Sequence, residues 1–158
     1  MNTWAPTPEL QTDRAMECGQ AVIVMCLKYC SGVWTSAAYL HDLVHPGSSG
    51  GTSLDELVAT FAIMETRATV SYPTSMNQIR TIAQKEINAG HPLIALRYWD
   101  HPGNSLLHFT AITGYSPTQL EQAGPGYGMM FSEDDDTFWS MYAGALILVH
   151  RKRMLGDH

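Results

Sequence analysis

The feature that most constrains the fold is a short, wholly apolar run near the N-terminus. Residues 21–27 read AVIVMCL, and Lys28 is the first charged residue after them. A helix that is apolar on every face belongs in the centre of a protein, because no side of it tolerates water. We therefore predict a central buried helix here, with Cys18 and Gly19 at its N-terminal end.

Three further helices are expected, over Ser36–Val44, from Ser53 to about Thr66, and over Met76–Asn88. The second begins with a Ser-x-x-Glu capping box, Ser53 to Glu56, which satisfies two backbone N–H groups. The third begins after Ser75, a good N-cap residue, and Gly90 ends it.

After residue 92 the pattern becomes that of strands. The expected strands are Leu93–Trp99, Phe109–Tyr115, Tyr127–Phe131 and Ala145–His150, with Thr69–Tyr72 as a candidate edge strand. They are short, apolar, rich in β-branched and aromatic residues, and separated by turn residues. Helices followed by strands, without alternation, predict an α+β fold in which N-terminal helices pack on a C-terminal antiparallel sheet.

Length and composition limit the possible partners. The 158 residues are enough for one domain, which we assign to 1–158, and 45% of them are apolar, as in globular proteins. The net charge of −6 argues against nucleic acid and anionic membranes as partners. We find no signal peptide and no apolar run long enough to span a membrane, and three cysteines are too few for a disulfide scaffold. These features predict a cytoplasmic protein without a cofactor.

Cys18 is the candidate nucleophile because of its place at the helix start. Unpaired N–H groups and the helix dipole there favour a thiolate, and the same N–H groups can bind an oxyanion. Gly19 lets a substrate backbone approach, whereas the carboxylate of Glu17 opposes a second negative charge. The alternative is a cysteine that only packs in the core.

His108 is the candidate general base. It stands at the start of the strongest predicted strand, after a Gly/Asn-containing turn. A side chain at the end of a strand is held rigidly and remains accessible, as a base requires. Taken alone, such a residue is more often a surface histidine.

Together these segments resemble a known family. Glu17-Cys18-Gly19-Gln20-Ala21 resembles the nucleophile segment of papain-like cysteine peptidases, and His108 with Gly114-Tyr115 resembles their histidine strand. The order of elements is similar to the bacteriocin-processing (double-glycine) peptidase branch, over about residues 11–150. The segments that carry this similarity are Leu27-Lys28-Tyr29, Gly51–Leu54 and Ala89–Ile94.

The resemblance implies a papain-like fold and a thiol hydrolase acting on a peptide or protein through an acyl-enzyme. Cys18 would attack the carbonyl carbon, and His108 would take the thiol proton. The backbone N–H of Cys18 and the side chain of Gln11 would bind the oxyanion, although Gln11 lies seven positions before the cysteine and the family has its glutamine six before. A deamidase, an acyltransferase, or a silent binding or inhibitor module on the same fold remain alternatives.

The residue that orients His108 is not given by the family pattern, because no Asp-Pro or Asn follows the histidine strand. If Phe109–Tyr115 and Tyr127–Phe131 pair as neighbouring antiparallel strands, either Asp134 or Ser132 lies opposite His108. We predict Asp134, since a carboxylate can fix the imidazole tautomer, with Ser132 as the fallback.

A zinc site is the rival interpretation. Cys26 and Cys30, and His41 and His45, each stand four positions apart, which together imitates a Cys₂His₂ ligand set. Such pairs arise readily by chance on helices, and Cys26 lies in the apolar run, so we predict no metal. The acidic run Glu133–Asp136 is interpreted as a solvated loop.

Overall fold

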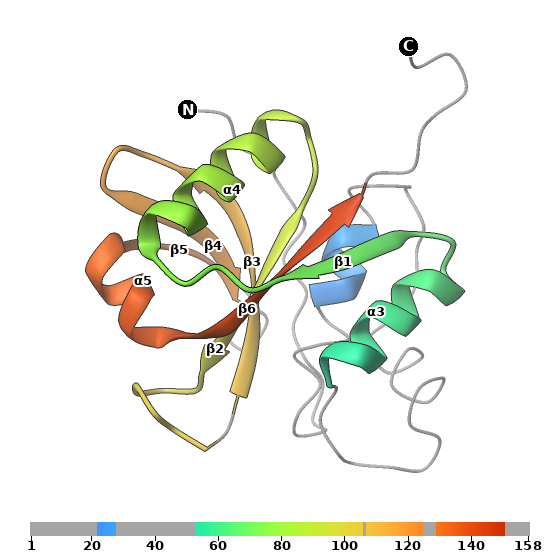
Figure 1. The fold of residues 1–158 in the computed structure, drawn as a ribbon, viewed down its shortest axis with the longest axis horizontal. Helices are drawn as coiled ribbons and strands as arrows, with labels where there is room; N and C mark the ends of the chain where they lie inside the picture. Colours follow the sequence, from blue (N-terminus) through green and yellow to red (C-terminus); the bar gives the residue numbers. More distant parts are fainter. Residues whose placement is uncertain (1–21, 28–52, 106, 125–128, 151–158) are drawn as a thin grey trace.

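The computed structural model describes residues 22–27, 53–105, 107–124 and 129–150. Residues 22–27 are helical. The elements that follow are α3 Leu54–Ile63, β1 Arg67–Ser71, α4 Met76–Asn88, β2 Leu93–Tyr98, β3 Leu107–Tyr115, β4 Gln119–Gly124, β5 Met129–Asp134, α5 Asp135–Met141 and β6 Tyr142–His150 (Figure 1).

The six strands form one sheet in the order β1-β6-β2-β3-β4-β5, and every neighbouring pair is antiparallel. The predicted α+β class with an antiparallel sheet is therefore confirmed. β1 lies at one edge of the sheet, as expected for the strand predicted around Thr69–Tyr72.

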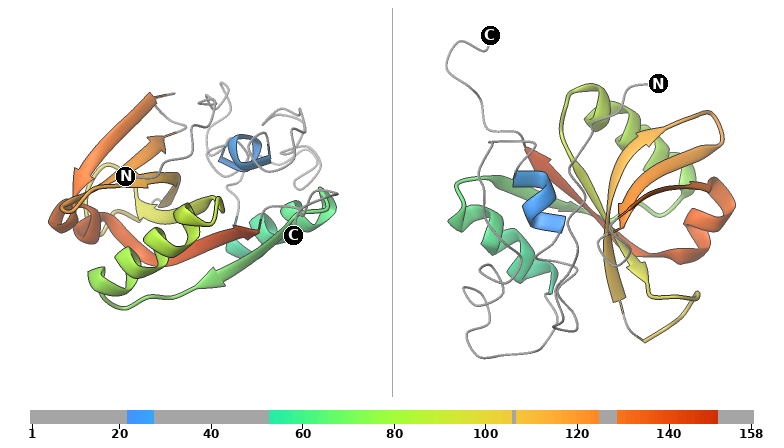
Figure 2. Two further views of the ribbon diagram at one scale, coloured as in Figure 1. Left: turned by 90° about the horizontal axis from the view of Figure 1, so that it is seen from above. Right: turned by 180° about the vertical axis from the view of Figure 1, so that it is seen from behind.

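Two apolar cores lie on opposite faces of this sheet. Residues 22–27 are fully buried and pack with α3 against one face, where β2 contributes Ile94 and Leu96. The alternate residues Leu93 and Ala95 join the core beneath α4. Accordingly, α4 lies in front of the sheet in Figure 1, and residues 22–27 lie in front of β6 in the view from behind in Figure 2. The predicted burial of the apolar run is confirmed for residues 22–27.

The capping residues begin the helices where the sequence predicts. Ser53 and Glu56 form the reciprocal capping box of α3, and Ser75 Oγ accepts from the N–H of Gln78 at 3.2 Å at the start of α4. α4 has the predicted bounds, whereas α3 ends at Ile63, before the expected Thr66. Its earlier end coincides with a left-handed residue, Glu65, at φ 58°.

Two elements were not predicted. β4 reads QLEQAG and has no β-branched or aromatic residue, so its sequence does not suggest a strand. The acidic run Glu133–Asp136, interpreted as a solvated loop, instead ends β5 and begins α5, so the loop prediction was wrong, although Asp134 and Asp136 are exposed. Asp134 is the N-cap of α5, and two further acidic residues form its first turn, where carboxylates favour the helix dipole.

Some expectations fall beyond the described ranges. The helix predicted over Ser36–Val44 lies outside the described residues, and so does most of the N-terminal segment that includes Cys18. No helix within the described ranges is long and apolar enough to cross a membrane.

Candidate active site

His108 is the second residue of β3, directly opposite Arg97 of β2. Directly opposed residues of antiparallel strands place their side chains on the same face of the sheet, close to one another. Both residues are only 6% exposed. A histidine and an arginine are therefore buried side by side at this end of the sheet.

The face that His108 occupies follows from strand alternation. Its neighbour Phe109 packs in the core that contains residues 22–27. Ile112, four positions after His108 and therefore on the same side of the strand as His108, belongs to the core beneath α4. The side chain of His108 therefore lies on the α4 and α5 side of the sheet. It reaches this side at the strand end, where the apolar core gives way to polar groups.

Beside His108 the chain encloses a cavity of about 280 Å³ between the sheet, α5 and the loop after β2. The Trp99 ring meets the imidazole edge to face, with centroids 4.6 Å apart. The Nε2 atom of His108 is buried and makes no hydrogen bond in the described part of the chain. Buried polar atoms without a partner are rare in proteins, and this one marks the cavity as a candidate site. Six of its lining residues are Arg97, Trp99, Asp100, His108, Phe131 and Thr137.

A buried ion pair forms one wall of the cavity. The guanidinium of Arg97 makes two hydrogen bonds to Glu133 of β5, Nη1 to Oε1 and Nη2 to Oε2, the second at 2.8 Å. Gln122 of β4 accepts from Arg97 Nη1 at 2.6 Å and donates to Glu133 Oε1 at 2.7 Å. Thr110 Oγ1 donates to the same Gln122 oxygen at 2.8 Å. Four strands thus contribute to one polar network.

This environment sets the charge of His108. Burial, together with the smaller effect of the positive charge of Arg97, lowers the pKa of the imidazole to about 4. At neutral pH His108 is uncharged, so one of its ring nitrogens carries a lone pair. Such a group can accept a proton, which is the property that a general base needs.

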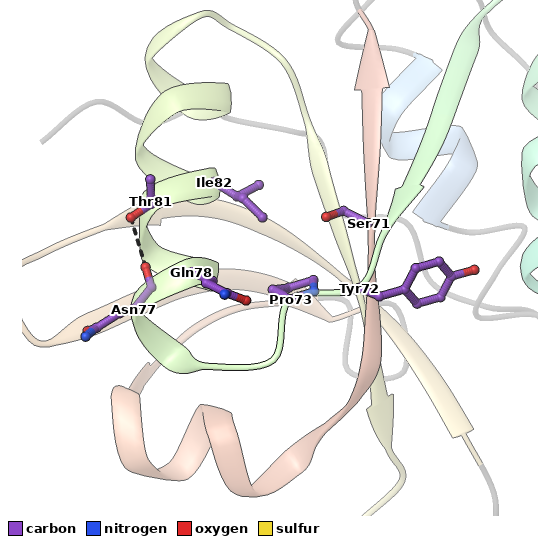
Figure 3. Close-up of a pocket in the computed structure, with 7 residues that line it drawn as sticks. All are labelled: Ser71, Tyr72, Pro73, Asn77, Gln78, Thr81 and Ile82. Atoms are coloured by element: carbon purple, nitrogen blue, oxygen red, sulfur yellow. Dashed lines mark hydrogen bonds between the residues drawn. The ribbon is translucent and has the colours of Figure 1, made fainter.

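A second, more open pocket of about 430 Å³ lies between α4 and the segment after β1 (Figure 3). Its lining includes Tyr72, Gln78 and Thr81 but no imidazole, thiol or carboxylate. Thr81 Oγ1 donates to the carbonyl of Asn77 (Figure 3). Gln78 Oε1 accepts from the N–H of Thr74. This pocket therefore lacks the thiol and imidazole that a cysteine nucleophile and its base would supply.

The structure places only some of the predicted site residues. Cys18 and Gln11 lie outside the described residues, so the contact between Cys18 and His108 stays a prediction. Three of the four residues in the rival zinc interpretation also lie outside, namely Cys30, His41 and His45. The fourth, Cys26, is fully buried in the apolar helix, and within the described ranges no group of three acidic, histidine or cysteine residues could hold a metal ion.

The strand pairing that selected Asp134 was wrong. β4 lies between β3 and β5, so β5 does not pair with the histidine strand. Asp134 lies opposite Gln119, and Ser132 lies opposite Glu121. Asp134 Oδ1 accepts from the N–H of Thr137 at 2.8 Å, a hydrogen bond that lowers the pKa of this carboxyl.

Sequence reasoning missed the polar network around His108. Arg97 is the single charged residue in the apolar run of β2, which is a signal that it needs a buried partner. Its partner, Glu133, belongs to the run interpreted as a solvated loop. Gln122 lies on the strand that was not predicted, so its burial could not be anticipated.

The family model of the Peptidase C39 family matches residues 7–154 of this chain. No curated protein matches the sequence significantly.

Solved structures with a similar fold cover nearly the whole chain. The peptidase domain of Streptococcus ComA, a bi-functional ABC transporter, is 20% identical with a TM-score of 0.74, over 91% of this chain and 97% of that one. A C39-like peptidase from Bacillus anthracis is 12% identical with a TM-score of 0.71, over 96% and 98%. A double glycine motif protease from an AMS/PCAT transporter, solved with a leader peptide, is 16% identical with a TM-score of 0.71, over 94% and 93%.

Proposed function

This chain belongs to the Peptidase C39 family, and we propose that it is a cysteine peptidase in which Cys18 is the nucleophile and His108 is the general base. The observation that carries the proposal is the buried Nε2 of His108, which has no hydrogen-bond partner among the described residues and lies beside a cavity. Buried polar atoms without a partner are rare in folded proteins, and a catalytic role is one of the recognised reasons for keeping such an atom. In free enzymes the catalytic hydrogen bond often forms only when substrate binds.

The proposed reaction has two stages. His108 Nε2 takes the proton from Cys18 Sγ as the sulfur attacks the substrate carbonyl carbon, and the backbone N–H of Cys18 and Gln11 stabilise the oxyanion. The C–N bond then breaks, and the imidazolium returns its proton to the leaving amine. Water, deprotonated by His108, hydrolyses the thioester and restores the free thiol.

A peptide is the proposed substrate. The cavity beside His108 is lined by aromatic rings such as Trp99 and by polar groups such as Thr137, which suits a side chain or backbone next to the scissile bond. One structural relative was solved with a leader peptide, which supports a peptide substrate for this chain as well. Because the nucleophile is a free thiol, the proposal includes a reducing, cytoplasmic location.

The test combines thiol labelling with a peptide library. Cys18 should react with iodoacetamide faster than the fully buried Cys26, which serves as an internal control. Mass spectrometry of the library should find cleaved peptides with the wild-type protein and none with Cys18→Ala.

The same experiment separates the alternatives. Deamidated peptides of unchanged length would indicate a deamidase, and peptides joined to an added amine would indicate an acyltransferase. An unreactive Cys18 together with intact peptides would contradict the proposal and favour a silent binding or inhibitor module.

A further inference from the structure

The cavity beside His108 carries a negative charge that no described residue balances. Of the described side chains that line it, Arg97, Asp100 and Glu133 are charged. Arg97 and Glu133 neutralise one another, because both terminal nitrogens of the guanidinium bind the carboxylate and Arg97 is only 6% exposed. Asp100 has neither an ion pair nor a side-chain hydrogen bond with another described residue. Its carboxylate is therefore the charge that a ligand in this cavity meets.

The loop after β2 holds Asp100 in a defined position. Its φ of 66° lies in the left-handed region, which aspartate and asparagine adopt more readily than other residues with a side chain. The carbonyl of Trp99 accepts hydrogen bonds from the N–H of His101 at 2.7 Å and from Nδ2 of Asn104 at 2.6 Å. These bonds close the turn around Asp100, whose side chain is exposed while it lines the cavity. The carboxylate therefore lies at the mouth of the cavity.

Behind this carboxylate the cavity is largely apolar. Tyr98, Trp99, Phe131 and Met141 contribute aromatic rings and a thioether to its lining. Its volume of about 280 Å³ lies just below the usual range for pockets that bind drug-sized ligands, and it suits a single long side chain. The methylene stems of lysine and arginine pack well on such surfaces, and aromatic rings attract their cationic ends. Aromatic rings beside a carboxylate therefore favour a basic side chain.

The same cavity contains the reacting end of the candidate site. His108 lines it, and the buried Nε2 of His108 has no hydrogen-bond partner in the described part of the chain. Trp99 connects this imidazole with Asp100, because the two ring centroids are 4.6 Å apart and Asp100 is the next residue. A side chain that enters the cavity therefore belongs to a substrate residue close to the bond on which His108 acts.

We propose that Asp100 is a specificity-determining residue that selects peptides with a lysine or arginine next to the scissile bond. The proposal rests on the proposed function, in which His108 is the base, and it names the class of peptide. The cationic end of the substrate side chain pairs with the Asp100 carboxylate, while its stem packs on Tyr98 and Trp99. A glutamate at the same substrate position meets a like charge and is rejected.

The first readout is binding, which needs no turnover. Fluorescently labelled peptides with lysine, norleucine or glutamate at one central position are titrated against Cys18→Ala protein by fluorescence anisotropy. The lysine peptide should bind about five-fold more tightly than the norleucine peptide, the upper scale of an exposed ion pair, and the glutamate peptide should bind most weakly. High salt should reduce the difference between the lysine and norleucine peptides, because it screens the exposed charge. Equal binding of the three peptides, or no binding of any, would overturn the proposal.

Two variants assign the preference to Asp100. Asp100→Asn removes the charge and keeps a residue that tolerates the left-handed backbone, so the lysine preference should disappear. Asp136→Asn removes the same charge from an exposed residue of α5 that does not line the cavity, so the preference should remain. A lysine preference that persists in Asp100→Asn, or is lost equally in both variants, would contradict the role of Asp100.

The second readout is the ratio of kcat/KM for lysine and norleucine peptides in proteins that retain Cys18. The ratio should be about five in wild type and Asp136→Asn, and about one in Asp100→Asn. A lysine preference in binding without turnover by any of these proteins would contradict the proposed function alone. Turnover with the same ratio in wild type and Asp100→Asn would contradict the role of Asp100 alone.

Discussion

Two histidines that lie near opposite ends of β2 differ in burial and in hydrogen bonding. Before the start of β2, His91 Nδ1 pairs with Glu86 Oε2 at 2.8 Å, and its side chain is 30% exposed. Its ring meets that of His150 edge to face, and His150 Nε2 lies 3.2 Å from Thr69 Oγ1. Opposite the far end of β2, His108 is 6% exposed, and its Nε2 has no partner in the described part of the chain.

This difference indicates which of the histidines can take part in catalysis. His91 and His150 have hydrogen-bond partners within the fold, as expected of residues that link α4, β1 and β6. His108 is buried, and no other described residue offers its Nε2 a hydrogen bond to replace the one that water would make, which costs stability. A residue that is kept at such a cost is better explained by a reaction than by packing.

The largest expected effect separates the two histidines by activity. His108→Asn should lower kcat/KM by about 100-fold or more, the scale of losing a general base. His91→Asn should leave kcat/KM within about two-fold, because its contacts lie at the other end of β2. Peptide cleavage assays at neutral pH measure both. Equal losses of kcat/KM in the two variants would contradict the distinction between His108 and His91.

The next effect concerns the acidic partners at the two ends. Glu133→Ala leaves the buried guanidinium of Arg97 without its carboxylate and should cost about 3–5 kcal/mol of unfolding free energy. Glu86→Gln keeps a polar partner for the half-buried His91 and should cost about 1 kcal/mol. Urea unfolding at neutral pH compares the two variants with the wild-type protein. A Glu133→Ala protein as stable as Glu86→Gln would mean that Arg97 reaches solvent.

The pH dependence of stability tests the burial of His108. Its pKa is about 4 in the folded state and 6.5 in the unfolded chain, so between these values only the unfolded chain takes up the proton. Stability should therefore fall as pH drops through this range, by up to about 3 kcal/mol. His108→Asn removes this loss, whereas His91→Asn retains it. Urea unfolding at pH 7 and pH 5 gives the comparison, and an equal acid loss in wild type and His108→Asn would contradict it.

The smallest expected effect tests whether Asp134 only caps α5 or also orients His108. Asp134→Ala removes the N-cap of α5 and should lower the melting temperature by about 2–4 °C, with kcat unchanged. Asp136→Ala, in the first turn of the same helix, is the control and should change the melting temperature less. A tenfold loss of kcat in Asp134→Ala alone would restore this residue as the partner that orients His108.

Several features follow from the sequence by itself, because they depend on residues close together along the chain. The apolar run at residues 22–27 requires a buried helix, and the Ser75 cap and Gly90 delimit α4 within one turn of each end. The short apolar run after residue 107 similarly predicts β3, with His108 near its start. The family resemblance also rests on such local segments, and it is confirmed by the match over residues 7–154.

The surroundings of His108 were decided only by the tertiary structure. Periodicity cannot show that the partly polar segment Gln119–Gly124 enters the sheet between β3 and β5, and this single insertion overturned the pairing that selected Asp134. The same insertion places Gln122 between Arg97 and Glu133 and converts an apparent surface run into the partner of a buried cation. Strand order depends on which surfaces bury one another, and that choice is made by the whole sheet and not by any one segment.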